Sequence, residues 1–306
     1  MKSRCPLCGS VEVRVLAVVR DEEYATSNAA YTYVECLACR AVYLPLPPTK
    51  SLKQIYPPNY YSAQPGKTLG LLQRVKSALE GRYFRKLLAR VPGGSLEILD
   101  VGGGTGWMAS AMRQADPRVK GSTVLDLDPG MRAAALAHGH AFVCKRIEDF
   151  RSRKTYDFIS LLNLIEHVAD PRRVLKSLRA SLKPGGFLLI KTPNTDSLDR
   201  HLFESSYWGG YHAPRHWVLF DRKNFAHLAQ ECGFEIESFS YTQGAPQWAA
   251  SLMALLARWA WVKVRPERPM FEQPLSKFFM ALGAAFDMLR GPWAKTDQMF
   301  FVLKIK

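Results

Sequence analysis

The chain has 306 residues, enough for one large domain and a small additional module. Apolar residues make up 47% of the sequence and charged residues 23%, as in an ordinary soluble globular protein. The formal net charge of +15 predicts an anionic partner, such as nucleic acid, a phosphorylated or lipid-linked substrate or a membrane surface, with a generally basic protein as the plain alternative.

Two features argue against a secreted or membrane-spanning protein. The basic start at residues 1–4 leads into Cys5-Pro6 instead of the apolar run of a secretory signal. The apolar stretches 247–264 and 275–289 both fall short of the ~20 uninterrupted apolar residues that span a bilayer. We therefore expect a cytoplasmic protein whose cysteines are reduced.

Two Cys-x-x-Cys pairs open the chain, Cys5 with Cys8 and Cys36 with Cys39, and strand-like runs lie between them at 11–20 and 31–35. Two such pairs can surround one tetrahedral ion with four thiolates. They predict a zinc ribbon over residues 1–45 with a structural Zn²⁺, because four protein ligands leave no open coordination position. A redox-active pair is the alternative. The isolated Cys144 and Cys232 are expected in the core.

A connector over residues 46–95 follows the ribbon. Its first part, "LPLPPTKSLKQIYPPNYYS", contains prolines that prevent regular structure. Residues 69–90 then carry apolar side chains at helical spacing, and Pro92-Gly93-Gly94 ends that helix.

From residue 96 the sequence alternates strand-like and helix-like segments. The expected strands are 96–101, 119–125, 142–145, 156–162, 187–191, 234–241 and 298–304. Helices are expected over 107–114 and 131–138, after an N-cap at Asp170, and from an N-cap at Asp221 to Gly233. We expect "KPGG" at 183–186 to separate the third helix from its strand. This alternation predicts an α/β domain with a parallel sheet and helices on both faces.

The stretch "ILDVGGGTGW" joins the first of these strands to its helix. It places Asp100 ahead of Gly102, Gly104 and Gly106, where side chains would block a ligand at the carboxyl end of the strand. A dinucleotide is compatible with the glycines, but an acid at the strand end favours a cationic ligand. The next strand ends at Asp126, which suits ribose hydroxyl groups.

Four segments in series, this loop, "VLDLDPGM", "YDFISLLNLIEHVADP" and "LKPGGFLLIKTPN", resemble the class I S-adenosylmethionine (SAM)-dependent methyltransferases. The resemblance implies a Rossmann-like seven-stranded sheet whose last strand is antiparallel. The SAM-binding core would cover residues 96–241, a helical insertion 242–296, and the final strand 297–306. A glycine loop that only packs a helix on a strand is the structural alternative.

The resemblance also implies positions for SAM. Asp100 and the glycine backbone would border the methionine part, and Asp126 would hold the ribose, with Leu127 and Asn163 as further contacts. Family members often place an acid after the third strand to meet the adenine, but this chain has Arg146 there. The adenine contact is therefore left open among Glu148, Asp149 and the backbone near Ile147.

Methyl transfer requires alignment of the acceptor with the methyl group, and an oxygen or carbon acceptor also needs a base. Histidine suits that task at neutral pH. The candidate bases are His212 and His216 in a lid or substrate loop at 205–220, and His167 after the fourth strand. Purely structural roles in packing or loop ordering are the alternative. Candidate substrate contacts are Tyr211 and Arg215 in the same loop, and Tyr60 and Tyr61 in the connector.

The ribbon, the "YPPNYY" connector and the core are also loosely similar to sugar C-methyltransferases of polysaccharide and natural-product pathways. We expect a small-molecule, sugar or lipid-linked glycan acceptor. The apolar insertion would pack over the substrate mouth or rest on anionic lipid at the inner face of the membrane. The alternatives are an RNA methyltransferase with a zinc module, which the positive charge would suit, and a SAM-binding protein without catalysis.

Overall fold

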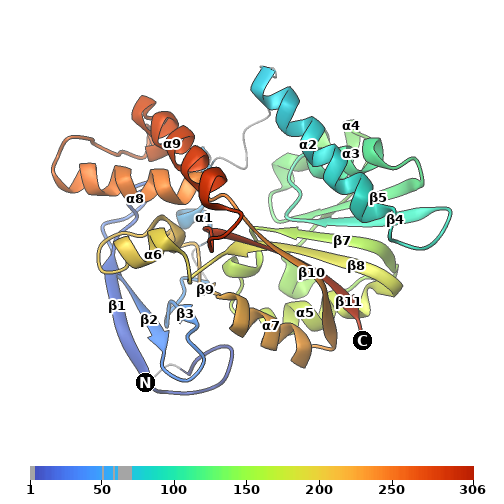
Figure 1. Cartoon of the computed structure of the whole chain (residues 1–306), viewed down its shortest axis with the longest axis horizontal. Helices are drawn as coiled ribbons and strands as arrows, with labels where there is room; N and C mark the ends of the chain where they lie inside the picture. The colour runs from blue at the N-terminus through green and yellow to red at the C-terminus, as the bar shows by residue number, and fades with distance from the viewer. Residues whose placement is uncertain (1–3, 50–51, 58, 61–70) are drawn as a thin grey trace.

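The computed structural model describes residues 4–49, 52–57, 59–60 and 71–306, and the side chains of residues 71–77 are outside the description. Figure 1 shows a large sheet flanked by helices, with the N-terminal strands and a helical hairpin gathered at one end of it. Tyr61, a predicted substrate contact, lies outside the described residues.

The large sheet has seven strands in the order β10-β11-β8-β7-β4-β5-β6. Their bounds are β4 Leu96–Val101, β5 Val119–Asp126, β6 Ala141–Cys144, β7 Tyr156–Leu162, β8 Leu182–Pro193, β10 Phe234–Thr242 and β11 Gln298–Ile305. The strands β8, β7, β4, β5 and β6 are parallel, whereas β11 is antiparallel to both β8 and β10. The predicted seven-stranded sheet with an antiparallel last strand is confirmed.

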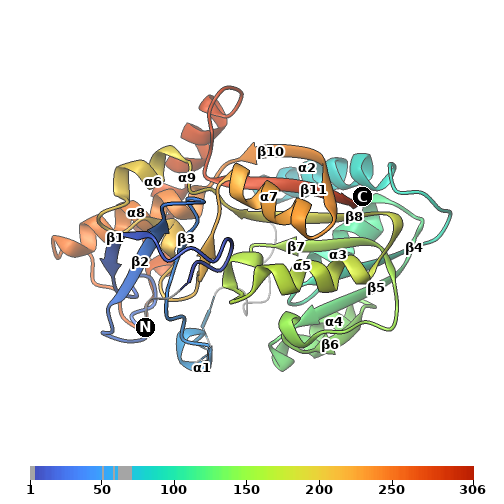
Figure 2. The ribbon, with the colours of Figure 1, turned by 90° about the horizontal axis from the view of Figure 1, so that it is seen from below.

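Helices cover both faces of this sheet. On one face lie α2 Leu71–Leu88, α3 Trp107–Ala115 and α4 Arg132–Ala137, and on the other α5 Pro171–Ala180 and α7 Arg222–Glu231 (Figures 1 and 2). The carboxylates of Asp170 and Asp221 accept backbone N–H groups at the starts of α5 and α7, as expected of N-cap residues. Gly233 ends α7 with a φ of +82°, which favours glycine.

Two apolar cores result from the alternation of side chains along the strands. Ile98 of β4 and Val124 of β5 pack toward α2 and α3, whereas their neighbours Leu99 and Leu125 face α5 and α7. The second of these cores continues into the N-terminal module, where it includes Tyr33 and Tyr43. The N-terminal module therefore shares its apolar core with the large domain.

The N-terminal module is a second sheet of order β1-β2-β3-β9. Its strands β1 Val13–Val19, β2 Tyr31–Cys36 and β3 Val42–Tyr43 come from the predicted ribbon, and the short helix α1 Leu52–Ile55 follows. The fourth strand, β9 Val218–Leu219, belongs to the predicted lid and pairs antiparallel with β3. The ribbon and the 205–220 segment are thus joined by backbone hydrogen bonds.

The insertion before the last strand forms a helical hairpin of α8 Ala245–Arg258 and α9 Pro274–Arg290, which lies beside α6 Leu198–Phe203 (Figure 1). Gly283 of α9 allows a close approach, because a Cβ there would lie 2.6 Å from Cβ of Trp248 in α8. Within the described part of the chain, no helix combines the length and apolarity needed to cross a membrane.

Three local expectations were wrong. The "KPGG" segment lies inside β8, because that strand already begins at Leu182 with an irregular register against β7. The expected helix over 131–138 is shorter, since a 3-10 turn at Pro129–Met131 precedes α4. Cys144 is exposed at the end of β6, an edge strand, instead of buried, whereas Cys232 is buried as expected.

Candidate active site and zinc site

The glycine loop lies at the carboxyl end of β4, in the turn that leads into α3. Gly102, Gly104 and Gly106 have φ values of +72°, +54° and +80°, a conformation that other residues rarely adopt. A Cβ at Gly103 would lie 2.5 Å from Oδ2 of Asp100. The loop therefore needs glycine both for its backbone conformation and for its close approach to Asp100.

Asp100 lies beneath this loop with an unpaired carboxylate oxygen. Oδ1 accepts a hydrogen bond of 2.6 Å from Oγ of Ser160, whereas the buried Oδ2 has no hydrogen-bond partner in the described ranges. Burial raises the pKa of Asp100 to about 6. A buried, unpartnered carboxylate oxygen beside a glycine loop fits a cationic ligand group, and the methionine part of SAM carries two such groups.

Asp126 ends β5 and is hydrogen-bonded to the loop. Its Oδ2 accepts the backbone N–H of Gly104 at 2.8 Å and its Oδ1 accepts that of Asp128 at 2.9 Å. Burial raises the pKa of Asp126. The carboxylate is thus oriented at the strand end, where the resemblance implied a ribose contact.

The other predicted cofactor residues lie at neighbouring strand ends. Leu127 follows β5 and is exposed, Ile147 is buried in the turn after β6, and Asn163 follows β7 with a φ of +50°. The carboxylate of Glu148 is ion-paired with Arg146 at 2.7 Å. Arg146, at the position where an acid was expected, is therefore neutralised by its neighbour.

The three predicted catalytic histidines come together in one cluster. The rings of His167 and His216 have centroids 4.6 Å apart, and those of His212 and His216 are 4.9 Å apart. His167 lies in the turn after β7, and the other two lie between α6 and β9. This turn also reaches the glycine loop, because a Cβ at Gly102 would lie 3.2 Å from the side chain of Leu164.

The tautomer of His212 is fixed by Glu23 of the zinc ribbon. Oε2 of Glu23 is 2.8 Å from Nδ1 of His212, and its Oε1 accepts a hydrogen bond of 2.9 Å from the hydroxyl of Tyr207. A carboxylate only accepts, so Nδ1 carries the proton and Nε2 presents a lone pair. That Nε2 is 3.0 Å from the hydroxyl of Tyr60, which donates to it.

The backbone at His212 is strained, with a φ of +40°. Such non-glycine conformations persist only where the surroundings enforce them, and they are frequent at functional sites. Here the enforcing contacts include those from Glu23 and Tyr60 on either side of the ring.

The other two histidines are neutral near pH 7. Burial lowers the pKa of His167 to about 3 and lowers that of His216 well below its usual value. Nδ1 of His167 is 2.8 Å from the hydroxyl of Tyr56, and Nδ1 of His216 donates to the carbonyl of Gly210 at 2.7 Å. Both rings are therefore fixed by their Nδ1 contacts.

Arg215 and Tyr211, the predicted substrate contacts of the loop, have internal partners. The fully buried Arg215 forms two hydrogen bonds of 3.1 and 2.9 Å to the carboxylate of Asp21 in the ribbon. Tyr211 stacks on Tyr33 with centroids 4.6 Å apart, and its hydroxyl donates to the carbonyl of Glu204. Residues 207–220 are buried throughout, so the loop is packed between the ribbon and the core.

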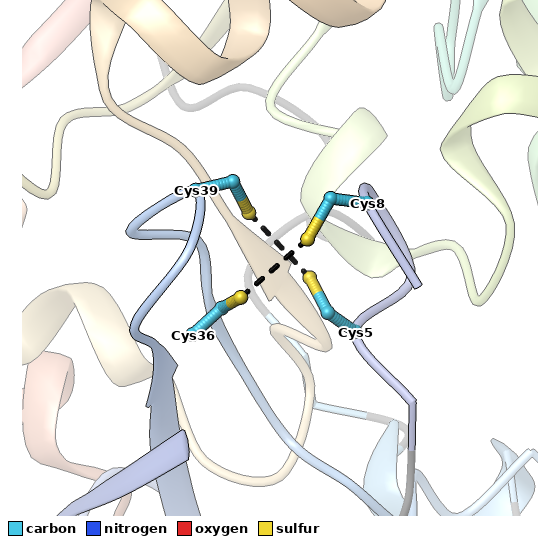
Figure 3. A group of neighbouring side chains, drawn as sticks. All are labelled: Cys5, Cys8, Cys36 and Cys39. Atoms are coloured by element: carbon cyan, nitrogen blue, oxygen red, sulfur yellow. Dashed lines mark hydrogen bonds between the residues drawn. The ribbon is translucent and has the colours of Figure 1, made fainter. Parts of the chain in front are cut away.

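The four cysteines of the ribbon converge on one point, as Figure 3 shows. All four Sγ atoms lie within 4.8 Å of one another, with Cys5 and Cys39 at 3.6 Å and Cys8 and Cys36 at 3.5 Å. A tetrahedral ion with Zn–S bonds of about 2.3 Å requires S–S separations of roughly 3.8 Å. The arrangement fits a closed, structural Zn²⁺ site.

Comparison with known proteins identifies the large domain. A family described as a methyltransferase domain matches residues 74–238, more than half of the chain. The chain belongs to this methyltransferase-domain family. A structure assigned as a sarcosine dimethylglycine methyltransferase from Galdieria sulphuraria has the same fold, with a TM-score of 0.51 and 18% identity over 76% of this chain and 87% of that one.

Two curated relatives of this methyltransferase domain are ubiquinone biosynthesis O-methyltransferases. The Vibrio parahaemolyticus protein is 34% identical over 108 residues, which are 32% of this chain and 44% of the relative. The Bradyrhizobium diazoefficiens protein is 29% identical over 109 residues, 33% of this chain and 41% of the relative. The chain thus matches less than half the length of these relatives.

Sequence reasoning missed four residues around the histidines of the methyltransferase domain. Asp21 and Glu23 lie in the acidic run "DEE", which looks like an exposed charged turn in the sequence. Tyr56 was one of several tyrosines in the connector. Glu166 adjoins His167 in "LIEH", and this adjacency was the one available signal for any of the four.

Proposed function

We propose that this protein is a SAM-dependent methyltransferase that methylates a hydroxyl group with His212 as the general base. The main observation behind this proposal is that the glycine loop with Asp100 and the histidine cluster lie at the same edge of the sheet. Leu164, in the turn that carries His167, lies next to Gly102 of the loop. The curated relatives named as O-methyltransferases support an oxygen acceptor.

The chain's own residues support SAM binding at the glycine loop. The unpaired Oδ2 of Asp100 would face the cationic methionine part, and Asp126 would exchange its Gly104 contact for ribose hydroxyl groups. Leu127, Asn163 and the 147–148 turn would complete the contacts around adenosine. When bound, SAM supplies a methyl carbon that the acceptor oxygen takes in an in-line displacement of sulfur.

His212 is the best-placed base of the three histidines. Glu23 holds the proton on Nδ1, so Nε2 is the basic atom of the ring. It would take the proton of the acceptor hydroxyl directly or through Tyr60. The imidazolium that forms would be stabilised by the buried Glu23 carboxylate. Tyr60 would lie nearest the acceptor, whereas Tyr211 and Arg215 would act through their internal partners by holding the loop that carries His212. The zinc ion would hold the ribbon that carries Glu23.

The exposed apolar face of α9 supports a further part of the proposal. The acceptor would be lipid-linked, and the protein would reach it at an anionic membrane surface. The fully buried residues of α9 are Ser276, Gly283 and Asp287, whereas the side chains of Phe278, Leu282 and Leu289 are exposed. Trp259, Trp261 and Trp293 are exposed near the ends of the hairpin. Nearby exposed cations are Arg258, Lys263, Arg265, Arg268 and Lys277. Tryptophan and basic side chains around an apolar face are typical of helices that lie on anionic lipid.

The SAM part of the proposal is tested by calorimetric titration with S-adenosylhomocysteine. We expect binding by the wild type and a large loss of affinity in Asp126→Ala. Asp196→Ala, which removes an exposed carboxylate paired with Lys295, is the matched control. Uptake of NAD without S-adenosylhomocysteine would contradict the proposal.

The base is tested by transfer of a labelled methyl group from SAM to bacterial extracts, separated into lipid and aqueous fractions. Replacing His212 by Asn should lower the rate by about 10²–10⁴-fold while S-adenosylhomocysteine still binds. Glu23→Gln should also lower the rate, because it no longer fixes the Nδ1 proton. His227→Asn is the control, since that histidine is 75% exposed on α7. An unchanged rate in His212→Asn would exclude His212 as the base.

A further inference from the structure

A second group of potential metal ligands lies in the histidine cluster. One ligand atom each from Glu166, His167 and His216 lie within 4.8 Å of one another. Two imidazoles and one carboxylate on one side of an ion form a ligand set that binds divalent transition metals and leaves the remaining coordination positions open. This set contrasts with the four thiolates of the ribbon, which close their site.

The carboxylate of Glu166 has one oxygen that is unpaired within the part of the chain that the structure describes. The side chain is fully buried, and its Oε2 accepts a hydrogen bond of 2.9 Å from the hydroxyl of Thr192 in β8. Among the described residues its Oε1 has no hydrogen-bond partner, and Nε2 of His216 lies 3.9 Å away, too far for a hydrogen bond. Burying an unpaired carboxylate oxygen is costly, and a bound cation removes that cost.

The imidazole of His216 is oriented in the way that metal-ligating histidines commonly are, and the ring of His167 is held by Tyr56 and by the backbone of Arg215. Nδ1 of His216 donates to the carbonyl of Gly210, so its Nε2 presents a lone pair toward Glu166. The hydroxyl of Tyr56 contacts Nδ1 of His167. Outer partners of this kind fix the ring orientation of metal-binding histidines.

We propose that Glu166, His167 and His216 bind a divalent transition-metal ion beside His212. Bonds of about 2.1 Å would place neighbouring ligand atoms roughly 3.0–3.4 Å apart, so small side-chain rotations close the site around an ion. If the proposed function holds, the open positions face the acceptor, and the ion adds Lewis-acid assistance to the proton removal by His212. The acceptor class would then be a hydroxyl compound with a second oxygen that can also coordinate.

The test measures metal content and does not require the acceptor. In the first experiment the protein is dialysed against Zn²⁺, and the number of zinc ions bound per chain is measured. In the second experiment Mn²⁺ is titrated into protein that holds zinc only in the ribbon. Mn²⁺ is a suitable probe because oxygen and nitrogen ligands accept it, whereas thiolates prefer softer ions. The wild type should hold two zinc ions per chain and bind one Mn²⁺.

Matched variants assign the second ion. Glu166→Gln and His216→Ala should retain the ribbon zinc and bind S-adenosylhomocysteine, but lose the second ion. Tyr56→Phe should weaken Mn²⁺ binding by about 10-fold through the orientation of His167. His201→Ala is the control, because this histidine is half exposed on α6 and lies outside the cluster.

The inference is overturned if the wild type stops at one ion per chain, or if both ligand variants keep the second ion. Failure of the proposed function gives a different result. Methyl transfer that proceeds without a second ion contradicts the metal site alone. A second ion without S-adenosylhomocysteine binding contradicts the proposed function alone.

Discussion

Asp100 shows how one buried carboxylate can link pH to ligand affinity. Its pKa is raised to about 6 because the side chain is buried, and its Oδ2 has no hydrogen-bond partner among the residues that the structure describes. Above this pH the group is a carboxylate and attracts a cation, whereas below it the group is neutral. A cationic ligand would favour the charged form and lower the pKa in the complex.

We expect the affinity for SAM to fall as the pH drops below about 6, by up to tenfold per pH unit, because the carboxyl must first lose its proton. Calorimetric titration between pH 5 and pH 8 measures this dependence. In Asp100→Asn the affinity should be lower at pH 8 and nearly independent of pH over this interval. A wild-type affinity that is constant from pH 8 to pH 5 would contradict the role of Asp100.

At the scale of elements, α9 differs from a helix that covers a core, because a charged residue faces inward and several large apolar side chains face outward. Asp287 faces inward, where it accepts hydrogen bonds from the indole N–H of Trp248 and the backbone N–H of Gly244. Arg290 pairs with the same carboxylate. Mainly small and polar residues of α9 are buried, together with contacts of Phe286 to Trp248 and of Phe279 to the core, whereas Phe278, Leu282 and Leu289 are left facing solvent.

The exposed face of α9 predicts binding to anionic vesicles. The triple variant Phe278→Ser, Leu282→Ser and Leu289→Ser should reduce co-sedimentation by about two orders of magnitude or more, since burying each such side chain contributes about 1.5–3 kcal/mol. Leu79→Ser on α2 is the control, because this leucine is 60% exposed on a different helix. Wild-type sedimentation no greater than with neutral lipid would refute the membrane contact, and a stable dimer burying α9 would assign the face to a second copy.

At the scale of the whole molecule, the zinc ribbon forms one wall of the proposed catalytic site. Its carboxylates Glu23 and Asp21 accept hydrogen bonds from His212 and Arg215, respectively. The hydroxyl of its Tyr33 donates to the backbone carbonyls of Tyr211 and His216. The four cysteines meet at one point of this module, and a bound ion would fix the two Cys-x-x-Cys turns there. The positions of the loop histidines would therefore depend on an ion that takes no part in the reaction.

Removal of the ribbon zinc should separate SAM binding from catalysis. We expect zinc-depleted protein to keep its affinity for S-adenosylhomocysteine within a few-fold, because the glycine loop belongs to the large sheet. Methyl transfer should be lost, since Glu23 no longer orients His212, and should return on adding Zn²⁺. Cys144→Ser serves as the control, because this exposed cysteine is outside the zinc site. Full turnover by zinc-free protein would show that the ribbon does not support the site.

The sequence by itself determined the features that depend on local physics. The N-caps at Asp170 and Asp221, the glycine turn after β4 and the spacing of the four cysteines each need only a few neighbouring residues to be recognised. The order of strands and helices followed from the same local patterns and predicted a parallel α/β sheet. The antiparallel last strand came from the resemblance to the SAM-dependent methyltransferases.

Only the tertiary structure decided which groups meet at the proposed catalytic site. Glu23 and His212 are 189 positions apart, and Asp21 and Arg215 are 194 apart. No local pattern marks such pairs, because a charged residue in an acidic turn looks the same in the sequence whether it is solvated or buried. The exposure of Cys144 and the outward apolar face of α9 were likewise set by what each element packs against. Burial and pairing are properties of the folded chain, and they assign these residues their roles.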